Sequence, residues 1–200
     1  MKYPVFASFI IFILVVRHAI RRNRRIGDEA ESSFWKREHD ANEVRRKPLD
    51  DLIYVKPDTS SFPLDTLADD PEITECRSLI EELKEQKIVN LTGQTNTDLK
   101  LRYGVANLPE LTEYDERYTL LVRTLQKWAD RLWEKGYTQE AIPILEEQVR
   151  IHADISSVYR KLASYYRDNG TPEKIEDLKK TAESLNSASK ASILRYLEEF

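Results

Sequence analysis

The second half of the chain contains a pattern that repeats after 34 residues. The repeated residues are a lysine, an alanine and a glycine: Lys127, Ala129 and Gly136, then Lys161, Ala163 and Gly170. In each copy a helix-favouring segment runs to the glycine, and a second such segment follows it. Glycine adopts the left-handed conformation that ends many helices, so the pattern predicts two successive helical hairpins. Each hairpin needs a neighbour to cover its second face, which predicts a stacked all-α array.

The stretch KGYTQEAIPILEE (135–147) resembles the tetratricopeptide family, whose helix–turn–helix unit has this period. Gly136 and Ala141 match the turn and the small residue where the two helices touch, and Tyr166 matches an aromatic position. Four positions depart from the family pattern: Leu132, Gln148, Ala153 and Ile175. The resemblance covers about 124–187 and implies repeats at about 124–157 and 158–191.

Other helical segments surround the repeats. Apolar residues at helical spacing predict helices over 72–89 and 113–135, and a capping helix within 187–200. Between them, residues 90–111 read as a polar loop in which Thr95 or Thr97 caps a short helix ending at Gly104. The helical domain is therefore predicted to span 72–200.

The N-terminal segment carries no charge from Tyr3 to Val16. Extended to Ile20 it is 18 residues long, which as a helix is about 27 Å and close to the hydrocarbon thickness of a bilayer. The flanking residues lack the small-residue cleavage site of a secretory signal. We expect a permanent transmembrane helix, with a cleaved signal or a helix lying on the membrane surface as alternatives.

Arginines follow the apolar run and predict its orientation. The cations expected at the membrane interface are Arg17, Arg21, Arg22, Arg24 and Arg25. Only Lys2 and the amino terminus precede the span, so the positive-inside rule places the N-terminus outside and residues 21–200 in the cytoplasm. The anchor and its basic stop occupy 1–27.

Residues 28–71 connect the anchor to the helical domain. A helix over 28–47 is expected, with Asp28 and Glu31 at capping-box spacing and Pro48 ending it. It is either a charged stalk or a docking site for a partner. Residues 49–71 are rich in proline and acidic residues and read as an extended arm packed on the helices.

The order of these segments resembles a group of bacterial single-pass membrane proteins of unknown activity. The residues that carry this resemblance are FW (34–35), LDDL (49–52) and NLTG…NTDLK (90–100). The group has an N-terminal span followed by tetratricopeptide-like helices, so the resemblance implies an architecture and no reaction.

Charge and composition exclude several classes of function. The chain has a net charge of −4, and residues 1–27 carry +6, which leaves −10 for the remainder and disfavours nucleic acid as a partner. The single cysteine, Cys76, forms no internal disulfide. His18, His39 and His152 lie too far apart for a helix-borne metal pair, and no phosphate-binding or nucleophile motif occurs. We expect no metal, no cofactor and no enzymatic activity.

The leading hypothesis is a membrane-anchored adaptor that binds a partner protein or peptide, with homo-oligomerisation possible. By the register of the family, the binding groove is lined by residues of the first helix of each repeat. These are Gln126, Asp130, Trp133, Arg160, Ser164 and Arg167. Trp133 is either an aromatic anchor for the partner or part of the core.

Two other classes of function remain open. An enzyme would need a pocket of converging polar groups, and the polar loop offers Asn90, Thr92, Asn96, Asp98 and Tyr103. The same side chains also suit turns and helix caps. A structural, oligomerising membrane protein would instead show an apolar patch on the 28–47 helix.

Overall fold

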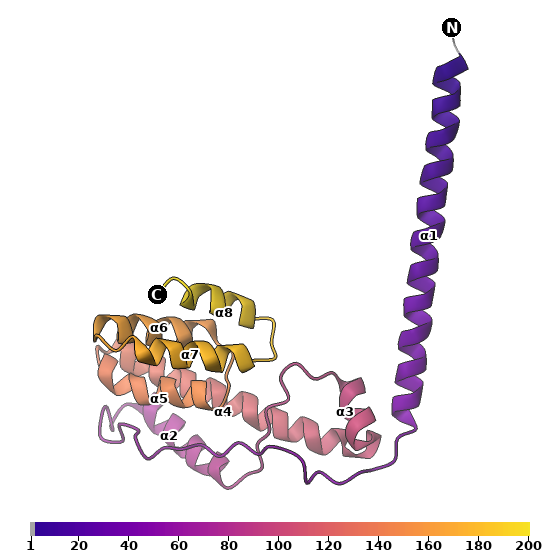
Figure 1. The fold of residues 1–200 in the computed structure, drawn as a ribbon. Coiled ribbons are helices and arrows are strands. Elements are labelled where there is room, and N and C mark those ends of the chain that lie inside the picture. The colour runs from indigo at the N-terminus through magenta and orange to yellow at the C-terminus, as the bar shows by residue number, and fades with distance from the viewer. Residues whose placement is uncertain (1–2) are drawn as a thin grey trace. The chain divides into compact units, whose positions relative to one another are not determined.

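The computed structural model describes residues 3–200, apart from the side chains of residues 3–8, 10, 23, 25 and 26. The described chain is all-α, as the sequence predicts (Figure 1). The helices are α1 (Tyr3–Asn42), α2 (Pro71–Lys84), α3 (Asn96–Tyr103), the 3-10 turn η1 (Val105–Asn107), α4 (Leu108–Glu134), α5 (Thr138–Arg150), α6 (Ser156–Asp168), α7 (Glu173–Ser184) and α8 (Lys190–Leu197). Among these described residues, one isolated antiparallel bridge, between Tyr54 and Val89, is the only strand-like pairing.

The chain divides into two compact units. Unit 1 comprises residues 1–47 and 95–108, and unit 2 comprises residues 48–94 and 109–200. These units differ from the predicted segments 1–27, 28–71 and 72–200. The difference arises because the units are defined by contacts between residues far apart in the sequence, which the composition along the chain does not reveal. Unit 1 holds 13 basic and 7 acidic residues, a net charge of +6, whereas unit 2 holds 18 basic and 28 acidic residues, a net charge of −10.

In unit 1, α1 is a single helix of 40 residues. The expected separate helix over 28–47 is therefore corrected: the helix continues through Gly27 and ends at Asn42, before Pro48. A glycine inside a helix costs about 1 kcal/mol, which a long helix tolerates. The helix ends early because the backbone beyond it bonds to the α3 region, where the Lys47 amide donates to the Tyr103 carbonyl at 2.9 Å.

The short helix α3 is attached to α1 by charged side chains. Its N-terminus has the capping box expected for Thr95, in which Thr95 and Asp98 bond each other's backbone amides. Glu38 on α1 accepts from both Lys100 and Thr97, and Arg37 pairs with Asp98. These contacts explain why the polar loop of the sequence belongs partly to unit 1.

In unit 2, α4–α5 and α6–α7 form the two expected hairpins (Figure 1). Gly136 and Gly170, 34 residues apart, end α4 and α6 with φ of +87° and +68°. The first of these helices begins at Leu108 rather than at the predicted residue 113, because Pro109 supplies the preset φ of a first helical turn. The hairpins bury Leu121, Leu125, Trp128, Leu145, Tyr159 and Leu162 in one core.

Further segments of unit 2 cover the hairpins. The predicted C-terminal helix is α8, which buries Ile193 and Leu197 in the shared core. Helix α2 adds Ile73, Cys76, Ile80 and Leu83 to the same core, and Phe62 of the arm meets Trp128 edge-on, with ring centroids 5.4 Å apart. The arm also pairs with the segment after α2, since the Val55 amide donates to the Ile88 carbonyl at 2.8 Å. This pairing ends α2 at Lys84 rather than at 89.

Candidate functional site

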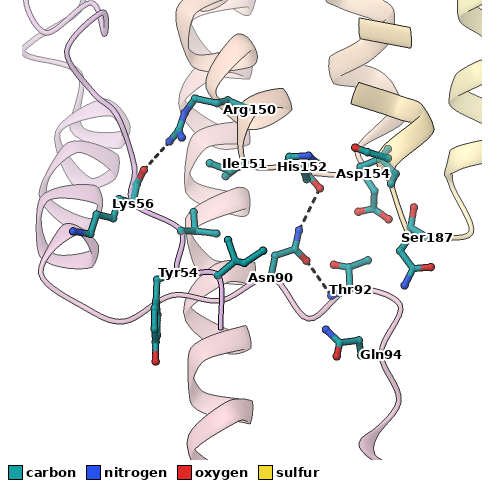
Figure 2. A pocket seen from close by; sticks show the side chains of 15 residues that line it. Tyr54, Lys56, Asn90, Thr92, Gln94, Arg150, Ile151, His152, Asp154 and Ser187 are labelled. Carbon is teal, nitrogen blue, oxygen red and sulfur yellow. Dashed lines mark hydrogen bonds between the residues drawn. The ribbon is translucent and has the colours of Figure 1, made fainter. Parts of the chain in front are cut away.

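A pocket of about 450 Å³ lies in unit 2 where four segments meet (Figure 2). Its walls come from the arm (53–56), the segment after α2 (90–94), the α5–α6 turn (150–154) and the segment after α7 (184–187). We call it the turn pocket. Its size is within the range of small-molecule sites.

Asn90 fixes the centre of this pocket. Its amide nitrogen donates to the hydroxyl of Tyr118 at 2.9 Å. The same nitrogen donates to the carbonyl of His152 at 3.4 Å, and the Asn90 side-chain oxygen accepts from the Thr92 amide at 3.0 Å (Figure 2). The Tyr118 hydroxyl donates in turn to the Ile151 carbonyl at 3.1 Å, and burial raises the pKa of this phenol. Asn90 therefore holds the pocket walls together, which is the bracing role that its sequence context also allowed.

His152 lines the turn pocket in a strained backbone conformation. Its φ is +62°, a left-handed value that glycine usually supplies at the end of a helix. The turn is closed by the Ala153 amide, which donates to the Gln148 carbonyl at 2.9 Å. A non-glycine residue held in this conformation costs about 1 kcal/mol or more, and such residues gather at functional sites.

Gly93 allows two walls of the pocket to touch. Its φ is +82°, and a Cβ atom placed there would collide with the backbone oxygen of Asn186. Only glycine fits this position without moving the wall, so the approach of the two segments depends on it.

Arg150 lines the pocket but is already engaged. Its guanidinium donates to both carboxylate oxygens of Glu147, at 2.6 and 2.7 Å, and to the Lys56 carbonyl at 2.6 Å. Glu147 also accepts from the Asp58 amide at 2.9 Å, and its carboxylate raises the pKa of Arg150. The Glu147 side chain is only 4% exposed. Because Arg150 bonds to Lys56 and Glu147 bonds to Asp58, the pair attaches the arm to α5.

The remaining polar-loop residues lie elsewhere. Asn96, Asp98 and Tyr103 belong to α3 in unit 1, whereas Asn90 and Thr92 line the turn pocket of unit 2. Bonds from the side chain and backbone of Thr95 hold the pKa of Asp98 below its ordinary value. The five predicted residues are therefore divided between the units, because a chain that is continuous in sequence passes from one to the other.

The predicted groove residues of the first repeat form a connected cluster on α4. Gln126 donates to Asp130 at 2.8 Å, and Lys161 of α6 donates to the same carboxylate at 2.6 Å. The Lys161 ammonium also lies 4.9 Å from the ring centroid of Trp133, which is half-buried against the core. Trp133 is thus partly core and partly surface.

The predicted groove residues of the second repeat meet α8. The guanidinium of Arg160 lies 5.0 Å from the ring centroid of Tyr196, and that of Arg167 lies 5.2 Å from the ring centroid of Phe200. The oxygens of Ser164 and Tyr196 are 3.5 Å apart. We call the surface formed by these residues of α4, α6 and the end of the chain the first-helix face.

Sequence reasoning missed three members of this face: Lys161, Tyr196 and Phe200. The repeat itself was the available signal for the aromatic pair. The helix after α7, α8, packs against both α6 and α7, so side chains from the end of the chain reach the cations of α6.

The N-terminal arginines follow α1. Arg17, Arg21, Arg22 and Arg24 are exposed on it, and the side chain of Arg25 is outside the described residues. The predicted span 3–20 also includes side chains outside the description, those of residues 3–8 and 10. Within the described part of the chain, no helix is both long enough and apolar enough to cross a membrane.

Other groups give no sign of a metal centre. Across the part of the chain that the structure describes, no three His, Cys, Asp or Glu side chains are grouped so that they could hold a metal ion. Burial raises the pKa of the Cys76 thiol to about 11, so it is not a nucleophile at neutral pH. Comparison of the chain with models of protein families, with curated proteins and with solved structures finds no match.

Proposed function

We propose that this chain is a membrane-anchored adaptor with tetratricopeptide-like repeats, which binds a partner protein or peptide through the first-helix face. The observation that carries the proposal is the alternation of cations and aromatic rings there: Lys161 on Trp133, Arg160 on Tyr196 and Arg167 on Phe200. Tryptophan, tyrosine and arginine are the residues that most often dominate binding energy at protein interfaces.

The exposure of these groups supports binding to another molecule. Arg160 and Arg167 are exposed on α6, and Phe200 is 36% exposed at the end of the chain. Stacking on rings restrains the guanidinium groups before a partner arrives, which lowers the entropy lost on binding.

The proposed anchor is the first half of α1, with the N-terminus outside the cell and unit 2 in the cytoplasm. The described side chains from Phe9 to Val16 are largely apolar and exposed, so lipid would cover surface that the protein leaves open. The whole helix of 40 residues is about 60 Å long, twice the hydrocarbon thickness. The second half would therefore project from the membrane as a stalk, and the tether would raise the local concentration of the binding face near membrane partners.

Replacement of Trp133 or Arg160 is expected to abolish partner capture. In crosslinked pull-downs from native membranes, Trp133→Ala and Arg160→Glu should each lower the yield of the specific partner by about tenfold or more. Arg123→Glu makes the same charge change on α4, where Arg123 is exposed outside the predicted groove set, and should capture the partner like the wild type. Recovery of the same partners at wild-type yield by both face variants would refute the proposed function.

A structural, self-associating role is the second candidate. Phe34 and Trp35 on α1 are 54% and 60% exposed, with ring centroids 5.3 Å apart. Adjacent exposed aromatic rings suit a contact with a second copy of the chain. Two differently tagged copies in the same pull-down distinguish this role, because co-capture lost in Trp35→Ser but kept in Trp133→Ala would favour it.

A further inference from the structure

Asp154 has an unpaired carboxylate in the turn pocket. In the described part of the chain, no hydrogen bond or ion pair joins this carboxylate to another residue. The residue is half-buried between α5 and α6. Burial and then the charge of Asp154 raise the pKa of Tyr118, and they raise that of Tyr159 to about 12.

Two hydroxyl groups in this part of unit 2 also lack partners. Ser187 lines the pocket, and its buried Oγ bonds to no other group of the described chain. The hydroxyl of the fully buried Tyr159 is also unsatisfied within the described residues, but Tyr159 does not line the pocket. A buried polar group without a partner is costly, so a guest that bonds to the Ser187 hydroxyl is favoured.

The cations of the pocket do not neutralise Asp154. Figure 2 shows Lys56 and Arg150 at one end of the pocket and Asp154 and Ser187 at the other, with Asn90 between them. Arg150 is bonded to Glu147 and to the Lys56 carbonyl. The two cations are therefore separated from Asp154, and His152 lies between Arg150 and Asp154.

The walls of the pocket are formed in advance of any guest. The Asn90 bonds join the loop to Tyr118 and His152, and Gly93 lets the loop touch the segment at Asn186. A site built in this way loses little entropy on binding. The net charge of −10 on unit 2 would in addition attract cations to it.

We propose that the turn pocket binds an ammonium or guanidinium group, with Asp154 as its counter-ion and Ser187 as a hydrogen-bond partner. Such a group is carried either by a free aliphatic amine or by a lysine or arginine side chain of a peptide. The site is separate from the first-helix face, and its failure leaves the adaptor function untouched.

Calorimetric titration of the full chain in a neutral detergent tests this proposal. The cationic probes are spermidine and the peptide acetyl-Ala-Lys-Ala-amide, and the neutral probe is the same peptide with acetylated lysine. At least one cationic probe should bind at one site, and the neutral probe should not. Binding of spermidine alone identifies a free amine as the source of the cation, and binding of the peptide identifies a side chain.

Variants locate the binding. Asp154→Asn should weaken binding by about tenfold or more, and Ser187→Ala by about threefold, whereas the exposed control Asp168→Asn should bind like the wild type. A second measurement uses the wild-type chain and so does not depend on the folding of a variant. Coupling of the bound amine with a carbodiimide should place the adduct on Asp154. Absence of binding, wild-type affinity in Asp154→Asn, an equal loss in Asp168→Asn or an adduct spread over many carboxylates would each overturn the proposal.

Discussion

Gly93→Ala is expected to destabilise unit 2 by about 2–4 kcal/mol, because the added Cβ adds a steric collision to the cost of the left-handed backbone. The atom in the way is the backbone oxygen of Asn186, which cannot rotate aside as a flexible side chain would. Urea unfolding of the full chain, followed by circular dichroism, measures this loss as a lower midpoint at unchanged slope.

Two other glycines distinguish the cost of the steric collision from the cost of the left-handed backbone conformation. Gly136 and Gly170 also have positive φ, but nothing lies within 4 Å of a Cβ placed at either position. Gly136→Ala and Gly170→Ala should therefore cost only about 1 kcal/mol each. If Gly93→Ala costs no more than these controls, the close contact between the two pocket walls is not a feature of the folded protein.

Arg150→Met should cost about 2–3 kcal/mol, since removing one partner of a buried ion pair leaves the other charge without compensation. The charge left behind is that of Glu147, whose side chain is 4% exposed, while Arg150 itself is 52% exposed. We place the expected loss below that of a fully buried pair for this reason. The variant also removes the bond to the Lys56 carbonyl, so the arm should become more sensitive to protease.

A second substitution tests the cause of this loss. Glu147→Met in the Arg150→Met background removes the stranded charge and should restore about half of the stability or more. Lys180→Met breaks an ion pair whose side chains are 74% and 71% exposed, and it should leave the midpoint of urea unfolding unchanged. A loss in Arg150→Met that the second substitution does not reduce would contradict the account of a buried charge.

The repeat made much of the fold predictable. Residues 34 apart identified both hairpins, and the spacing of Ile193 and Leu197 identified α8, because helical periodicity and glycine turns are local properties. The end of α1 was not predictable. Its last turn competes with hydrogen bonds from the following segment to α3, and these depend on residues far along the chain.

The candidate sites were predictable only in part. Family register placed Trp133, Arg160 and Arg167 at positions where the structure has cation–aromatic contacts. The turn pocket was beyond sequence reasoning, because its walls come from four segments that lie far apart in the sequence, and no local pattern marks Asp154. The left-handed conformation of His152, with φ of +62°, could not be predicted either, because no local sequence pattern indicates it.

Site-specific thiol labelling in intact cells tests the central claim, that an N-terminal anchor holds unit 2 in the cytoplasm. The native cysteine should not react with the label, because Cys76 is 2% exposed and burial raises its pKa to about 11. One cysteine is added in a short extension ahead of Met1, and another replaces the exposed Asp177. A membrane-impermeant maleimide should label the first in intact cells and Asp177→Cys only after lysis. Labelling of Asp177→Cys from outside, or equal behaviour of the two sites, would contradict the account.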